Sequence, residues 1–244
     1  MHRAADALPR AVRRDLDDRR DQSLARALRR QYRSDLPFAG VPIHTVVRLL
    51  VSSLADPALS PSDHESWEDA IRNLWSVDPS HESRYAAVAL ARHPRYRAYA
   101  SSPRATSIYR DLVTDDPTPE TADAVAHFCL PLPLSAAPET EVPVMRSWAV
   151  VDSEWLRRSA ILSQVRRRHA IDRDLLKACV GANLLERHAV VRDAIPEALA
   201  AYARTRTPAC PWLRATLDGW KTQMPASLAR AVHARLADDA GAAR

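Results

Sequence analysis

Apolar side chains recur at helical spacing along almost the whole chain, and prolines separate them into short segments. The clearest segment follows Pro42, because the apolar residues of 43–54 follow the i, i+3, i+4, i+7 rule and proline suits a first turn. Ser66 and Asp69 form a capping signal for the next helix, and residues 5–33 are charged and favour a helix. Further helices are predicted around Tyr85 and near 104–114, 119–130, 141–151, 154–169, 173–185, 188–204, 208–221 and 225–237.

This pattern predicts an all-α protein of about a dozen short helices, since alternating Val and Ile are absent while Ala, Leu and Arg abound. Short helices joined in pairs by tight loops are typical of a HEAT-like α-solenoid, or superhelix. A compact helical bundle stays open, because no repeat motif is visible. The predicted organisation is a charged N-terminal arm or first helix over 1–24, a single HEAT-repeat domain over 25–237 and a disordered tail over 238–244.

Composition excludes some classes of protein and favours an anionic partner. The four glycines are too scattered to form a phosphate-cradling loop, so a nucleotide-binding α/β fold is not expected. The 35 basic residues exceed the 30 acidic ones by five, and all but Lys177 and Lys221 are arginine, whose planar fork suits phosphate. A GC-rich genome favours arginine as well, so the excess alone does not establish a nucleic-acid partner.

Cysteine usage and hydropathy bear on the compartment. The three cysteines, Cys129, Cys179 and Cys210, are far apart and odd in number, which predicts neither a disulfide framework nor a metal site. The N-terminus lacks an apolar stretch, and no run of about 18 apolar residues occurs, so no membrane partner is expected. We therefore expect a cytoplasmic protein with reduced, buried thiols.

Four segments, in order, carry a family resemblance. They are QYRSDLPFAGVPIHTVVRLL (31–50), LWSVDPSHESRYAAVAL (74–90), SEWLRRSAILSQVRRR (153–168) and VVRDAIPEALAAYARTRTP (190–208). Together they resemble the AlkD family of bacterial DNA alkylation-repair glycosylases, from about residue 25 to residue 237. The WLRR segment is the most specific part.

The resemblance implies a curved HEAT-like domain that holds duplex DNA on a basic concave face, as a nucleoid-associated monomer without cofactor or metal. It also implies DNA alkylation repair: hydrolysis of the N-glycosidic bond of purines alkylated at N3 or N7, without flipping the base into a pocket. The chemistry is consistent with one carboxylate, because a cationic base leaves readily as a neutral molecule. An ionised carboxylate then stabilises the oxocarbenium character of the sugar and holds the attacking water.

The family's catalytic aspartate corresponds best to Asp123 in the segment PETADAVAHFCLPL. A second register, three residues later, places Ala126 there and leaves no carboxylate. Asp123 could also be a solvated aspartate paired with His127, one helical turn away. The resemblance therefore predicts Asp123 as the catalytic residue, with these two alternatives open.

Three positions near the expected lesion depart from the family. Pro119 and Glu197 stand where the family has tryptophans, and Ala200 replaces an arginine. Pro196 is expected to kink the helix that carries the last two. These departures keep two alternatives open: a duplex- or branched-DNA-binding protein without hydrolysis, and a helical scaffold for another protein.

Arginines are the expected contacts to the DNA backbone. Arg158 is expected to project between apolar positions, where it either extends past them to solvent or grips a phosphate. The tryptophans lie at apolar helix positions and are expected in the core. The predicted DNA-binding residues are Arg157, Arg158, Arg166, Arg168 and Arg192.

Overall fold

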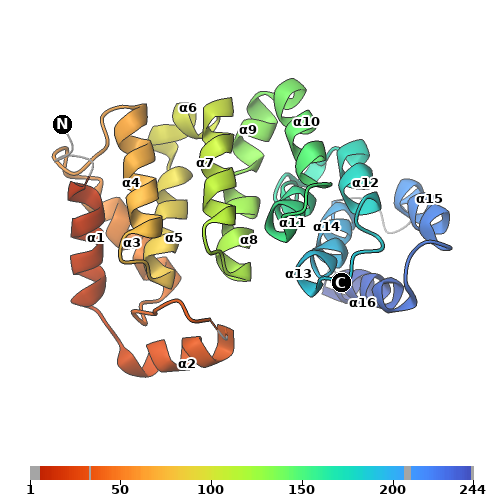
Figure 1. Cartoon of the computed structure of the whole chain (residues 1–244), viewed down its shortest axis with the longest axis horizontal. Coiled ribbons are helices and arrows are strands. Elements are labelled where there is room, and N and C mark those ends of the chain that lie inside the picture. Colours follow the sequence, from red (N-terminus) through yellow and green to blue (C-terminus); the bar gives the residue numbers. More distant parts are fainter. Residues whose placement is uncertain (1–5, 33, 206–209, 243–244) are drawn as a thin grey trace. The chain divides into compact units, whose positions relative to one another are not determined.

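The computed structural model of the chain describes residues 6–32, 34–205 and 210–242 (Figure 1). Every regular element in these ranges is a helix, which confirms the all-α prediction. The chain divides into two compact units, 1–124 and 125–244. Each unit is described by itself below. Among the described residues, no helix is both long and apolar enough to cross a membrane.

The first unit is built from helices of four to thirteen residues. The segment expected as an arm or first helix is helical, and α1 buries Leu8, Val12 and Leu16. The helices are α1 (Ala7–Asp17), α2 (Gln22–Tyr32), α3 (Ile43–Ser53), α4 (His64–Ser76), α5 (His81–Ala91), α6 (Arg97–Ala100), α7 (Pro103–Thr114) and α8 (Pro119–Phe128), which spans the division, with a 3₁₀ turn at Pro94–Tyr96.

Local hydrogen bonds explain where α4 and α5 begin. Asp63 caps α4, since its side chain accepts from the backbone of Ser66 while the Ser66 hydroxyl accepts from Asp63. The capping signal at Ser66 therefore acts three residues earlier than predicted. Ser80 and Ser83 form the same reciprocal arrangement at α5. Helix α5 then packs against α3 and α4.

A buried carboxylate fixes the loop between α2 and α3. Glu82 is 1% exposed, and its carboxylate accepts hydrogen bonds from the backbone N–H groups of Ala39, Gly40 and Val41 at 2.9, 2.8 and 3.2 Å. Gly40 has a φ of 77°, and a Cβ there would lie 2.1 Å from the Asp21 carbonyl oxygen. Only glycine fits this close approach, which explains the glycine of the 31–50 segment.

The second unit continues the pattern of short helices. Helix α16 continues as far as Ala242, so the predicted tail over 238–244 is helical up to that residue, as its alanines favour. The helices are α9 (Pro131–Ala136), α10 (Pro138–Trp148), α11 (Glu154–Leu162), α12 (Arg173–Gly181), α13 (Ala189–Arg192), α14 (Ala194–Ala203), α15 (Pro211–Trp220) and α16 (Ala226–Ala242), with a 3₁₀ turn at Arg168–Ala170.

Two predicted helices are shorter than expected. The helix predicted over 154–169 ends at Leu162, because the buried Gln164 side chain bonds both the N–H and the carbonyl of Asp172 and turns the chain toward α12. The helix predicted over 188–204 breaks at Asp193. Pro196 then lies in the first turn of α14, where it needs no N–H donor.

Candidate functional site

Helix α8 carries the predicted catalytic residue. Pro119 begins this helix, and Thr118 and Thr121 bond each other at its start. Asp123 is partly exposed, although the residues on both sides of it are buried. Ala126, the alternative position, is wholly buried. Of the two registers, the one with a carboxylate therefore falls on the more accessible position of the helix.

Tyr85 of α5 lies within electrostatic reach of two acidic residues of α8. Burial and then the nearby groups of Tyr32, Glu120 and Asp123 raise the pKa of Tyr85 to about 12. Its hydroxyl is therefore a neutral donor at physiological pH. One carboxylate oxygen of Glu120, Oε2, is buried and has no hydrogen-bond partner.

Four aromatic rings form a cluster beside these acidic groups, which we call the ring cluster: Tyr32, Phe38, His81 and Tyr85. The His81 ring centroid lies 5.2 Å from that of Tyr32, 4.6 Å from that of Phe38 and 4.9 Å from that of Tyr85. Burial, with the charge of Arg84, lowers the pKa of His81 to about 4. His81 is therefore neutral at physiological pH, and its buried Nε2 atom has no hydrogen-bond partner.

Sequence reasoning did not identify the ring cluster. Its residues come from the end of α2, the loop before α3 and the start of α5, so no single periodic pattern contains them. The segment 74–90 indicated a family resemblance, but no role followed for Tyr85 or His81. The available signal was the aromatic residue following HESR at the start of a small apolar helix.

Helix α2 presents an arginine-rich face next to the ring cluster. None of its residues is buried, and Arg26, Arg29 and Arg30 are exposed. Figure 1 shows α2 running crosswise to α1 and α4, beyond one end of both. The helix ends at Tyr32, which belongs to the ring cluster. A basic helix of this kind suits a phosphate backbone.

In the second unit, two predicted DNA-binding arginines have partners within the chain. Arg157 pairs with Glu186 at 2.8 Å and donates to the carbonyl oxygens of Val151 and Asp152. Arg158 is 8% exposed and donates to the Val190 carbonyl oxygen. Arg157 therefore ties α11 to the loops before and after it in the chain, and Arg158 ties α11 to α13.

The other predicted arginines are more accessible. Arg166 is exposed, and its guanidinium lies 4.8 Å from the centroid of the Phe128 ring. Arg168 is exposed and has a positive φ of 52°. Arg192 ends α13 and lies 3.7 Å from a carboxylate oxygen of Asp193.

Of the positions that depart from the family, Pro119 begins α8, Glu197 lies next to a histidine, and Ala200 is a small residue. Nε2 of His127 lies 3.3 Å from a carboxylate oxygen of Glu197. Both side chains are largely covered, at 13% and 30% exposure. Ala200 is wholly buried. Four of the six tryptophans are buried as predicted, namely Trp67, Trp75, Trp148 and Trp220. The prediction is wrong for Trp155 and Trp212, which are partly exposed.

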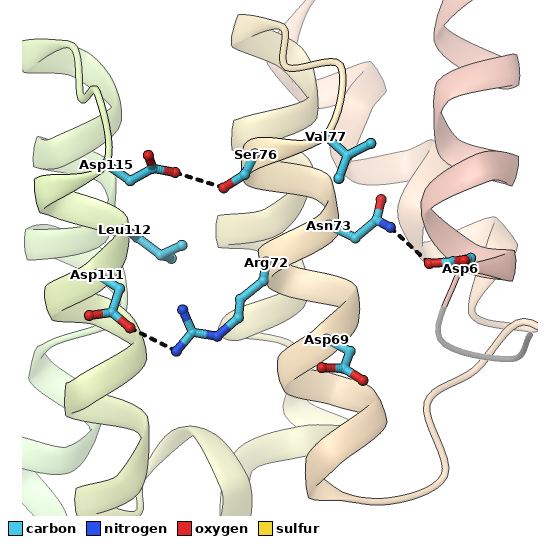
Figure 2. A pocket seen from close by; sticks show the side chains of 9 residues that line it. All are labelled: Asp6, Asp69, Arg72, Asn73, Ser76, Val77, Asp111, Leu112 and Asp115. Carbon is cyan, nitrogen blue, oxygen red and sulfur yellow. Dashed lines mark hydrogen bonds and ion pairs between the residues drawn. The ribbon is translucent and has the colours of Figure 1, made fainter. Parts of the chain in front are cut away.

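A pocket of about 470 Å³ lies among α1, α4 and α7 (Figure 2). Four of the described residues that line it are aspartates, Asp6, Asp69, Asp111 and Asp115. Arg72 in the same pocket is bound to Asp111 at 2.8 Å. Negative charge repels phosphate, so this lining does not favour contact with a nucleic-acid backbone. Within the described ranges, no group of three His, Cys, Asp or Glu residues suits a metal ion.

Comparison with known proteins identifies the family. No curated protein matches the chain. A solved structure described as a predicted DNA alkylation repair enzyme from Enterococcus faecalis has a TM-score of 0.73 and 18% identity, over 87% of this chain and 94% of that chain. This likeness confirms the predicted fold. The family model described as DNA alkylation repair enzyme matches residues 12–231. The chain therefore belongs to the DNA alkylation repair enzyme family, which confirms the resemblance found in the sequence.

Proposed function

We propose that this protein is a DNA glycosylase that hydrolyses the N-glycosidic bond of purines alkylated at N3 or N7 in duplex DNA. The observation that supports this most is the partly exposed Asp123 carboxylate beside a neutral tyrosine and a cluster of aromatic rings. Family membership supplies the class of substrate, which is alkylated DNA.

Asp123 is the proposed catalytic residue. Alkylation at N3 or N7 gives the purine a positive charge, so the base leaves as a neutral molecule and needs no proton from the enzyme. As the bond to C1′ breaks, the sugar gains positive charge, and a fixed carboxylate lowers the energy of that state. The same carboxylate accepts a hydrogen bond from the water that attacks C1′. The reaction requires no cofactor and no metal.

Two sets of arginines are proposed to contact the DNA backbone. Arg166, Arg168 and Arg192 remain from the sequence prediction, since their side chains reach solvent at least in part. The exposed arginines of α2, Arg26, Arg29 and Arg30, are added to them. Contacts of this kind give binding that is independent of sequence and weakens as salt rises.

Arg157 and Arg158 have a different proposed role. Their guanidinium groups are held by Glu186 and by backbone carbonyl oxygens. An arginine that already satisfies buried acceptors loses those bonds if it turns to a phosphate. We therefore assign both as positioning residues, Arg157 for the loops next to α11 and Arg158 for the contact between α11 and α13.

The proposed activity is tested by incubating the protein with methylated duplex DNA and measuring the free bases released. The account predicts 7-methylguanine or 3-methyladenine above the level of a protein-free control. Undamaged duplex serves as the second control, because a neutral purine leaves poorly without protonation. Release of bases from undamaged DNA at a similar rate would contradict the charge-driven mechanism.

One observation favours a second function, namely duplex binding without hydrolysis. The Glu197 carboxylate lies 3.3 Å from Nε2 of His127, at a position where the family resemblance expects a tryptophan. The same incubation distinguishes the two functions, when binding to the methylated duplex is measured alongside. Salt-sensitive binding without release of any base would support the binding protein and exclude the glycosylase.

A further inference from the structure

The ring cluster has a buried centre and partly exposed ends. Phe38 and His81 are 8% and 3% exposed, whereas Tyr32 and Tyr85 at either side of His81 are partly open to solvent. The loop that carries Phe38 is held by the hydrogen bonds to Glu82, and the His81 N–H donates to the Pro37 carbonyl oxygen at 2.9 Å. The two tyrosines are therefore supported by a fixed base of buried rings.

Charge beside the cluster determines which ligands suit it. Glu120 and Asp123 act electrostatically on Tyr85, whereas the positive charge of Arg84 acts on His81, so negative charge accompanies the ring cluster at Tyr85. Ring faces attract cations through their quadrupole, and they stack on flat aromatic molecules. A planar aromatic cation satisfies both preferences, whereas phosphate or a neutral aliphatic molecule does not. A purine alkylated at N3 or N7 is a ligand of this class.

We propose that Tyr85 is the residue that recognises the cationic base, and that its ring performs the role for which Pro119 and Glu197 leave no tryptophan. The proposal rests on the proposed function for its substrate and deepens it by naming a specificity-determining residue. Tyr85 is favoured over Tyr32 because it lies inside α5, with its ring centroid 4.9 Å from that of His81, whereas Tyr32 is the last residue of α2. Tyr85 is also the ring on which both carboxylates of α8 act. The Tyr85 ring is required, and its hydroxyl is secondary.

The test compares two substitutions that separate ring from hydroxyl. Tyr85→Phe keeps the ring, and Tyr85→Ala removes it. Tyr99→Ala is the matched control, since Tyr99 is also a partly exposed tyrosine of the first unit and stacks on the His64 ring at 5.0 Å. The probe is a short duplex with one 7-methylguanine on a 2′-fluoro sugar, because fluorine destabilises the oxocarbenium state and slows cleavage. Binding to this duplex and to the undamaged duplex gives a lesion preference for each variant.

Wild type is expected to bind the lesion duplex more tightly than the undamaged duplex. In Tyr85→Ala the ratio of the two affinities is expected to fall about tenfold, which is the effect of one lost stacking contact. Tyr85→Phe and Tyr99→Ala are expected to keep the preference within about twofold, and all variants to bind undamaged duplex alike. An unchanged preference in Tyr85→Ala, or an equal loss in Tyr99→Ala, would overturn the proposal. Because the readout is binding, a preference that Tyr85→Ala loses would support recognition by Tyr85 even if the protein released no base from methylated duplex with ordinary sugars. That second result would contradict the proposed hydrolysis alone.

Discussion

Two buried polar side chains in this protein, His81 and Arg158, differ in whether they carry a charge. His81 is a polar ring that is neutral among aromatic rings, and Arg158 is a buried cation that donates to a backbone carbonyl oxygen. Burying either group has a free-energy cost that depends on its partners. The stability of the protein should therefore respond to pH at His81 and to substitution at Arg158.

Acidification is expected to destabilise the protein through His81. The folded-state pKa of about 4 is below the ordinary value of 6.5, so the unfolded chain takes up the proton first as pH falls. This contribution is fully present above pH 6.5 and decreases as pH falls toward 4. From pH 7 to pH 5 the loss is about 2 kcal/mol. Urea unfolding of wild type and His81→Phe at both values measures it, and an equal loss in the variant would exclude His81 as the cause.

Replacing Arg158 by alanine is expected to lower the free energy of unfolding by about 2 kcal/mol or more, because the Val190 carbonyl oxygen loses its donor. Arg168→Gln, at an exposed arginine, should change stability by less than about 0.5 kcal/mol while it weakens duplex binding. Denaturant unfolding and duplex binding of both variants separate the two roles. If Arg158→Ala were as stable as wild type but bound duplex much more weakly, Arg158 would be a DNA contact and the positioning role would be wrong.

At the scale of elements, the loop before α3 connects the ring cluster to the arginines of α2. Glu82 holds the N–H groups of residues 39–41, and the Ala39 carbonyl oxygen accepts from the Asp21 N–H at 3.0 Å. Asp21 in turn accepts from the first N–H groups of α2. The carboxylate of one buried residue thus fixes both Phe38 and the start of the basic helix.

Glu82→Gln is expected to destabilise the protein by about 3 kcal/mol. The substitution removes a charge that three N–H donors require, and it turns an amide NH₂ toward them. Thermal or denaturant unfolding measures the change. Glu65→Gln is the control, because Glu65 is an exposed acidic residue in the first turn of α4. A difference of less than about 1 kcal/mol between the two variants would contradict the role given to Glu82.

Helix periodicity predicts most of the elements, and the failures have local causes. The helix after Pro42 begins at Ile43 as expected, because its apolar face and its proline agree. Helix α11 ends early because the Gln164 side chain bonds the backbone N–H and carbonyl of Asp172 and turns the chain there. Helical spacing of apolar residues does not predict such a contact. Short-range pattern therefore predicts helices better than it predicts their ends.

The candidate site was partly predictable for the same reason. Asp123 follows from the family resemblance, and its partial exposure is consistent with helical spacing. The ring cluster was not predictable, because its rings meet through a loop whose course is set by Glu82 and Gly40. The burial of Arg158 depends on the Val190 carbonyl oxygen, which lies in a different helical segment.

At the scale of the whole molecule, arginines give the chain its net charge of +5, and the account assigns six of them to the DNA backbone. The acidic pocket among α1, α4 and α7 carries the opposite sign, so positive charge is not spread evenly over the first unit. Duplex binding should therefore depend on particular arginines and on salt concentration.

Duplex binding is expected to weaken linearly on a plot of log affinity against log salt, without sequence preference. Replacing Arg26, Arg29 and Arg30 together by glutamine should reduce the slope by about 2 to 3, since each lost phosphate contact removes close to one released ion. A matched variant tests whether net charge alone explains the effect. It replaces three exposed arginines in or just after α1 by glutamine, namely Arg10, Arg14 and Arg19. Equal changes in both triple variants would contradict a specific role for α2.

The central claim is that the Asp123 carboxylate stabilises the positive charge that develops on the sugar. Asp123→Asn keeps the size of the side chain but removes its charge, and a preorganised group of this kind contributes about 3 to 4 kcal/mol.

The decisive measurement is single-turnover release of 7-methylguanine from methylated duplex by wild type and Asp123→Asn, at saturating protein, with binding measured on the same DNA. The account predicts a rate lower by roughly a hundredfold or more in the variant, with binding unchanged or slightly tighter. Equal rates in the two proteins would contradict the catalytic assignment of Asp123.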